Sequence, residues 1–178
     1  MMVVVTTTGV WTVRRAGVEQ PDAAELLYAY YDELVSRYQG RPSLPGEVDG
    51  VMLDEPNDDL AVFFVASLDG EPAGCVGIRM LAPDLAELTR MYVRPRFRRA
   101  GGGRLLLGAA DGAAVELGAS VIRLDTRHDL VEARAMYARY GYREIAAYND
   151  SRYADHWFEK SLTAGAGPGS VSSASQTD

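Results

Sequence analysis

The feature that most constrains the fold is a strand, a basic glycine-rich turn and a helix that follow one another within 86–107. Residues 86–93 alternate between apolar and polar side chains and end just before a proline, which is typical of a strand. Gly101–Gly103 then lead into the apolar helix start Arg104–Leu107. Such a turn directs unpaired backbone N–H groups and the positive end of a helix dipole to one point, where phosphate groups bind well.

The charge around this turn indicates an anionic ligand. The chain has a formal net charge of −7, yet five arginines surround the turn: Arg94, Arg96, Arg98, Arg99 and Arg104. The turn is not a P-loop, because no lysine and hydroxyl residue follow Gly103. It is not a dinucleotide-binding fingerprint either, since Leu106 stands where the third glycine belongs.

Length and composition narrow the class of protein. The 178 residues, 47% apolar and 24% charged, suit one soluble globular domain. The acidic balance argues against nucleic-acid binding, and the single cysteine, Cys75, fits a reducing compartment. No apolar run approaches the roughly 20 residues of a membrane span. We therefore expect a cytoplasmic protein with no nucleic-acid or membrane partner.

Hydrophobic periodicity predicts an α/β or α+β domain with a mixed sheet. The expected strands are 10–15, 60–68, 73–81, 86–93, 120–126, 142–147 and 156–162. The expected helices are 22–38, 101–117 and 131–140. A helix separates strands 86–93 and 120–126, so these two should be parallel, whereas the strands just before them should be antiparallel.

The boundaries of the domain follow from the same patterns. Strand 10–15 is expected to be the first edge of the sheet, after an N-terminal extension over residues 1–9. The domain is expected to span residues 10–162, with a long loop over 39–59. The Gly-, Ala- and Ser-rich tail 163–178 is expected to be disordered.

Two motifs carry a resemblance to a known family. Arg98–Gly103 fits the pattern R/Q-x-x-G-x-G/A, and Ala133–Tyr142 matches A-x-x-L-Y-x-K-x-G-F with Met, Arg and Tyr as replacements. Together with the order of the elements, they resemble the GNAT N-acetyltransferase superfamily over residues 10–162, and a bacterial small-molecule-type member in particular. The chain departs from the family at Leu130, where an asparagine is usual.

The resemblance implies a fold and a cofactor. It implies a GNAT-like mixed, mostly antiparallel sheet, flanked by helices, in which the one parallel pair of strands splays apart. Acetyl-CoA is the implied co-substrate, with no metal. The implied pyrophosphate cradle is the backbone of Arg98, Arg99, Ala100, Gly101, Gly102, Gly103 and Arg104. Pantetheine would pair with the strand at Met91, Tyr92 and Val93, whose N–H groups could also receive an oxyanion.

The chemistry of amine acetylation requires a base and an acid. An alkyl ammonium with a pKa near ~10 has no lone pair and must lose a proton before it attacks. On the family's analogy, Glu87 is the candidate base; the alternative is a solvent-facing charge on the strand. Tyr137 is the implied general acid that protonates the departing thiolate.

Other residues are weaker candidates. His128 is a possible secondary base, and His156 has no metal-ligand spacing with it. Cys75 suits a small buried residue, because an acetyl-cysteine intermediate would need a base that the sequence does not offer. Asp125 either contacts an amine or caps a turn. For four tyrosines of the first helix, packing and substrate contact are both open roles: Tyr28, Tyr30, Tyr31 and Tyr38.

These observations predict an acetyl-CoA-dependent N-acetyltransferase that acts directly on a primary amine of a small molecule, or on a peptide amine. The alternative from another class is a non-catalytic module that binds or senses acyl-CoA. The loops 39–59 and 148–153 are expected to form the acceptor mouth, where their acidic residues would favour a cation. Exposed strand edges make a homodimer possible.

Overall fold

The structure is a computed structural model that describes residues 1–6 and 9–162. The tail expected to be disordered, 163–178, lies outside the described residues. The strands are β1 Met2–Thr6, β2 Gly9–Arg15, β3 Val62–Leu68, β4 Glu71–Ala82, β5 Leu85–Val93, β6 Val121–Thr126, β7 Arg143–Ile145 and β8 His156–Ser161. The helices are α1 Pro21–Gln39, α2 Glu47–Asp54, the 3-10 turn η1 Pro95–Phe97, α3 Gly102–Glu116 and α4 Val131–Arg139.

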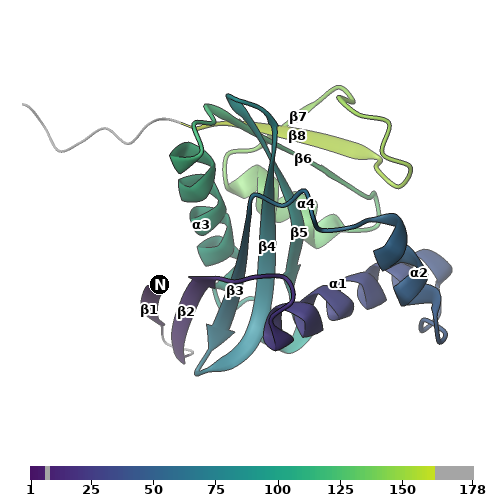
Figure 1. Cartoon of the computed structure of the whole chain (residues 1–178). Coiled ribbons are helices and arrows are strands. Elements are labelled where there is room, and N and C mark those ends of the chain that lie inside the picture. Colours follow the sequence, from purple (N-terminus) through teal and green to yellow (C-terminus); the bar gives the residue numbers. More distant parts are fainter. Residues whose placement is uncertain (7–8, 163–178) are drawn as a thin grey trace, which may run out of the picture.

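All the described strands form one mixed sheet in the order β1-β2-β3-β4-β5-β6-β8-β7. Only β5 and β6 are parallel; every other pair is antiparallel. The predicted mixed, mostly antiparallel sheet is therefore confirmed. In Figure 1, α3 and α1 lie on either side of the central strands.

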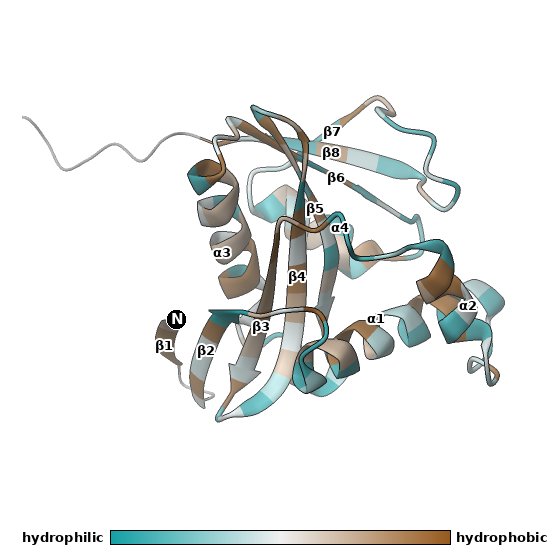
Figure 2. Cartoon of the chain, viewed as in Figure 1, coloured by the Kyte–Doolittle hydropathy of each residue, from teal (hydrophilic) through white to brown (hydrophobic). Residues whose placement is uncertain are grey.

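Two hydrophobic clusters hold these layers together. On one face, Leu106 and Leu107 of α3 pack with Val76 and Ile78 of β4. On the other face, Leu26 and Leu27 of α1 pack with buried residues of β3, β4 and β5. Figure 2 shows β3 as apolar along most of its length, whereas β8 is mostly hydrophilic. Within 1–6 and 9–162, no helix is long and apolar enough to cross a membrane.

Three expectations differ from the structure. Strand 10–15 is not the edge of the sheet, because Met2–Thr6 pairs along β2 as a further strand of Val and Thr residues, which favour strands. Residues 47–54 form the short helix α2, which the sequence does not signal because Val48 is its one buried residue. β7 is three residues long and shorter than expected. The boundaries of the domain stay a prediction.

The parallel pair separates soon after it begins. β5 and β6 are paired only at Leu85↔Val121, Ala86↔Ile122 and Glu87↔Arg123, although both strands continue beyond these residues. A β-bulge follows in β5, because Cys75↔Tyr92 and Gly77↔Thr89 place two β5 residues opposite one β4 residue. One of the two, Arg90, has a φ of 54°. A bulge bends its strand, so β5 turns away from β6 and the predicted splay is confirmed.

Candidate functional site

The N-terminus of α3 is built to receive an anion. Gly101, the residue before the helix, has a φ of 94° and gives the helix no side-chain cap. The first backbone N–H groups of a helix have no acceptor within the helix. A Cβ added to Gly101 would meet no atom within 4 Å, so a ligand can approach the backbone there. Open amides at the positive end of a helix dipole suit a diphosphate such as that of coenzyme A.

The other two glycines of the turn are required by packing. A Cβ on Gly102 would lie 2.3 Å from the Trp11 ring, which is fully buried and donates its N–H to the Ala100 carbonyl over 2.9 Å. A Cβ on Gly103 would lie 2.8 Å from the Met136 sulfur. Because Gly102 has no side chain, the first turn of α3 can pack against β2. Gly103 allows the same turn to pack against α4. The motif alone does not separate these packing roles from ligand contact.

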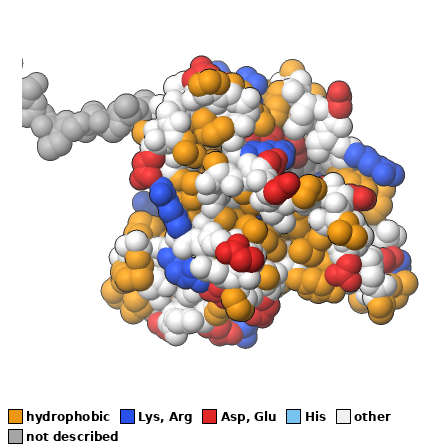
Figure 3. Space-filling view, viewed as in Figure 1, with side chains coloured by type: hydrophobic (Ala, Val, Ile, Leu, Met, Phe, Trp, Pro, Cys, Tyr) orange, Lys and Arg blue, Asp and Glu red, His pale blue; other side chains and the backbone are white. Residues whose placement is uncertain are grey.

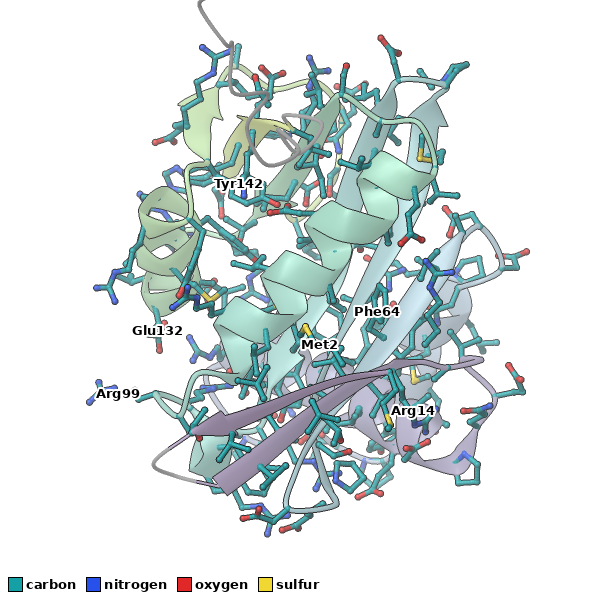
Figure 4. All side chains as sticks on the ribbon, turned by 90° about the vertical axis from the view of Figure 1, so that its left-hand side faces the viewer. Met2, Arg14, Phe64, Arg99, Glu132 and Tyr142 are labelled. Atoms are coloured by element: carbon teal, nitrogen blue, oxygen red, sulfur yellow. The ribbon has the colours of Figure 1, made fainter. Side chains whose placement is uncertain are left out.

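Most of the arginines around the turn are neutralised within the protein. Arg94 pairs with Glu25 at 2.6 Å, Arg98 pairs with Glu33 at 2.5 Å, and Arg96 pairs with Glu71. The other two arginines of the turn, Arg99 and Arg104, are exposed and have no ion-pair partner within 1–6 and 9–162. Figure 4 shows Arg99 extending away from the body of the protein. The positive charge left for an anion therefore lies at these two residues and at the amides of α3.

The C-terminal part of β5 lies between this turn and the point where β5 and β6 separate. Tyr92 faces α1, where its ring lies 6.4 Å from that of Tyr30. Met91 and Val93 pack at the opposite face, against the cluster that contains α3. The Val93 carbonyl accepts a hydrogen bond of 2.8 Å from Arg98. Because the described pairing with β6 ends at Glu87, the β6-facing edge of this segment can pair with an extended chain.

Glu87 lies at the point where the two strands part, and it is buried. It is 3% exposed, so the alternative of a solvent-facing charge is wrong. Its Oε2 accepts from the Arg79 guanidinium, and its Oε1 accepts from the Tyr148 hydroxyl over 2.6 Å. Arg79 also bonds Asp59 at 2.8 Å, so its charge is shared between two carboxylates.

The loop between β7 and β8 reaches both splayed strands. Tyr148 bonds Glu87 of β5, and Asn149 donates to the Asp125 carboxylate of β6 over 2.7 Å. The Trp157 indole donates to Asn149 over 2.7 Å and fixes that amide. Sequence reasoning predicted that this loop borders the acceptor site, but gave no signal that singles out Tyr148. Burial raises the pKa of Asp125 and also that of Tyr148, whose shift its bond to Glu87 increases.

Tyr137 is a buried phenol on α4. It is 5% exposed, and its ring packs at 5.7 Å from Tyr142 and 6.2 Å from Phe158. Within the described part of the chain its hydroxyl has no hydrogen-bond partner. Burial raises its pKa, and the charges of Tyr30 and Asp125 raise it further. A phenol keeps its proton at neutral pH in any case, and the raised pKa makes Tyr137 a weaker acid than an exposed tyrosine.

The weaker candidates lie apart from this chemistry. The His128 side chain is 75% exposed, and its Nδ1 lies 2.8 Å from Asp155. His156 pairs with Glu144 at 2.6 Å. Cys75 is fully buried, and burial raises the pKa of its thiol, which disfavours a nucleophilic thiolate. Within the described ranges, no three His, Cys, Asp or Glu side chains form a group that could hold a metal.

The tyrosines of α1 have separate roles. Tyr31 is fully buried and donates to the Glu55 carbonyl over 3.3 Å, so it serves packing. Tyr28 and Tyr38 are exposed. Tyr30 is half-buried beside Tyr92, and burial raises its pKa to about 12. Of the four, Tyr30 is the one whose ring is paired with that of Tyr92, near the end of β5.

The bulge of β5 carries a buried arginine, beside Tyr31, that the sequence patterns do not single out. Arg90, at the β5 bulge, is 7% exposed and donates to Asn57 over 2.9 Å. Its guanidinium also lies 3.3 Å from the Glu55 carboxylate and 5.3 Å from the centre of the Tyr31 ring. The bulge thus ties β5 to the segment that precedes β3.

Comparisons with known proteins give the family and the fold of the chain. The chain is 31% identical over 101 residues to an uncharacterised N-acetyltransferase of Chlorobaculum tepidum, and the match covers 54% of this chain and 62% of that protein. An acetyltransferase of the GNAT family from Staphylococcus aureus has a similar structure, with a TM-score of 0.65 and 16% identity over 86% of this chain and 99% of the other. The PaiA N-acetyltransferase of Thermoplasma acidophilum, solved in complex with coenzyme A, has a TM-score of 0.63 and 20% identity over 85% of this chain and 98% of the other.

The sequence profile of a family gives the assignment. The two structural matches, at these identities, show the fold alone. The profile of the acetyltransferase (GNAT) family matches residues 24–142, which is more than half of the chain. The chain therefore belongs to the GNAT family of acetyltransferases.

Proposed function

We propose that this protein is an acetyl-CoA-dependent N-acetyltransferase that transfers the acetyl group directly to a primary amine of a small molecule, or of a peptide. The observation that carries the proposal is the position of Glu87. This buried carboxylate lies where β5 and β6 part, and β5 runs from there to the open amides of α3. Membership of the GNAT family supports the same activity.

The residues at the turn fit coenzyme A. The amides of Gly102, Gly103 and Arg104 would hold its diphosphate, with Arg99 and Arg104 supplying positive charge. The free edge of β5 at Met91–Val93 would pair with the amides of pantetheine. When bound, acetyl-CoA supplies an acetyl group activated as a thioester.

The side chains around the splay would accept and donate the protons of the reaction. An ammonium acceptor must become a neutral amine before it attacks, and Glu87 is the candidate base. Tyr137 holds its proton at neutral pH and is the candidate acid for the leaving thiolate. The preference for a cationic acceptor is supported by Asp125, a half-buried carboxylate on β6 next to this region. A cytoplasmic location, a site without metal and a homodimer stay predictions from the sequence.

A thiol-release assay with acetyl-CoA tests the proposal, using amino acids, polyamines, aminoglycosides and peptides as acceptors. We expect turnover with at least one amine. Glu87→Gln and Tyr137→Phe should each lower kcat by about 10²-fold or more, since general acids and bases contribute factors of that size. Calorimetry should show nearly unchanged affinity for coenzyme A in both variants. Binding of coenzyme A without turnover of any amine would instead favour the acyl-CoA-binding module.

A further inference from the structure

We propose that Tyr148 is a catalytic residue that takes the proton from the acceptor amine while it passes its own hydroxyl proton to Glu87. The inference rests on the proposed acetyltransferase activity. It differs from that proposal in one respect, which is that Tyr148 and not Glu87 contacts the amine. In this scheme Glu87 is the final proton acceptor, and Tyr148 is the group in contact with the substrate.

The surroundings of Glu87 motivate the proposal. Its Oε2 is bonded to Arg79 and its Oε1 to Tyr148, and the side chain is buried. Each oxygen of Glu87 therefore already has one bonding partner, and burial keeps an amine away from the lone pairs that remain. Tyr148, in contrast, is half-buried in a loop at the mouth of the splay, and its oxygen keeps lone pairs while its proton is donated to Glu87.

The proton transfer balances without any further reactant. One N–H bond of the ammonium breaks, its electron pair stays on nitrogen, and the proton forms a new O–H bond on Tyr148. The original O–H bond of Tyr148 breaks at the same time, and that proton forms a bond to Oε1 of Glu87. Tyr148 ends neutral, as it began, and Glu87 ends as a carboxylic acid. Arg79 keeps Asp59 as an ionised partner when Glu87 becomes neutral.

Contacts other than that of the Tyr148 hydroxyl also hold the loop in place. Asn149 anchors the loop to Asp125 and to Trp157, and the Arg123 guanidinium lies 5.3 Å from the centre of the Tyr148 ring. None of these contacts involves the Tyr148 hydroxyl, so phenylalanine can keep them. Tyr148→Phe should therefore remove the proposed proton path and leave the packing around it in place.

The test compares Tyr148→Phe with Tyr140→Phe in the full chain, using an amine that the wild type acetylates. Tyr140 is a half-buried tyrosine at the end of α4 whose hydroxyl bonds no side chain within 1–6 and 9–162, so this control should retain wild-type rates. Tyr148→Phe should lower kcat by about 10²-fold, with coenzyme A affinity close to that of the wild type. The variant should also unfold at a lower temperature, because Oε1 of the buried Glu87 loses its donor. A purely structural role would raise KM and leave kcat nearly unchanged.

The pH profile gives a second readout. The ionisable groups that face Tyr148 and Glu87 are Arg79 of β4, Asp59 before β3, and Arg123 and Asp125 of β6. Without the relay, the rate of Tyr148→Phe should follow the neutral fraction of the amine. Its kcat/KM should then rise about tenfold per pH unit below the pKa of the amine and approach the wild type at high pH.

Two outcomes would overturn the proposal, and they are distinguishable. If the wild type is active and Tyr148→Phe is equally active or faster, Tyr148 is only a hydrogen-bond partner of Glu87. The relay is then wrong, while the acetyltransferase activity stands. If the wild type acetylates no amine of the panel, the proposed function fails and the relay fails with it.

Discussion

At the scale of single residues, the glycines around α3 divide into those that meet a neighbour and those that do not. Gly102 lies against the buried Trp11 ring, whereas Gly108, in the middle of the same helix, has no atom within 4 Å of an added Cβ. Gly102→Ala should lower the free energy of unfolding by about 1–3 kcal/mol, because the ring must shift. Gly108→Ala should raise it by about 0.5–1 kcal/mol, because alanine favours the helix. Urea unfolding of both variants tests the contrast, and equal stabilities would contradict it.

At the scale of the element, α4 begins without a side-chain cap. Leu130 is its N-cap residue, and it makes no capping hydrogen bond. An asparagine there can accept from the first backbone N–H groups, which leucine cannot. Leu130→Asn should therefore be about 1 kcal/mol more stable than Leu130→Ala, which loses the same leucine side chain but adds no cap. Thermal unfolding of the two variants measures the difference, and an asparagine variant no more stable than the alanine variant would show that the helix start does not bind the side chain.

At the scale of the whole molecule, buried tyrosines govern stability at alkaline pH. Burial is the main cause that raises the pKa of Tyr30, Tyr31, Tyr137, Tyr142 and Tyr148. In the unfolded chain a tyrosine loses its proton near pH ~10. Above that pH the unfolded state binds fewer protons than the folded state, so the free energy of unfolding falls as pH rises, by up to about 1.4 kcal/mol per unit for each such tyrosine. The stabilising effect of neutral tyrosines is fully present below pH ~10.

An alkaline titration followed by tyrosinate absorbance and circular dichroism checks this expectation. A part of the absorbance change should coincide with the loss of secondary structure. Complete ionisation of all ten tyrosines while the fold persists would contradict the assignment.

On the face seen in Figure 3, acidic and basic side chains lie beside one another, in keeping with the many surface ion pairs.

The sequence by itself determined the parts that local patterns encode. Alternation over 86–93, the glycines at 101–103 and the apolar spacing that follows gave the strand, turn and helix of the anion site, because each depends on neighbours in the chain. The crossover helix gave the parallel pairing of β5 and β6, since a short connection cannot make it. The short helix α2 was missed, because its one buried residue, Val48, gives no apolar periodicity. The edge strand β1 was missed although its partner β2 follows directly, because residues 2–5 are an apolar run without alternation.

Only the tertiary structure decided which groups meet at the splay. The bonds of the buried Glu87 join its strand, β5, to Arg79 of β4 and to Tyr148 of the loop between β7 and β8, and Tyr148 lies 61 residues from Glu87 in the chain. The seating of Gly102 on Trp11 likewise depends on β2, which lies far away in the chain. Side chains of this kind are placed by packing and by the pairing of buried charges. The spacing of nearby residues in the sequence predicts neither.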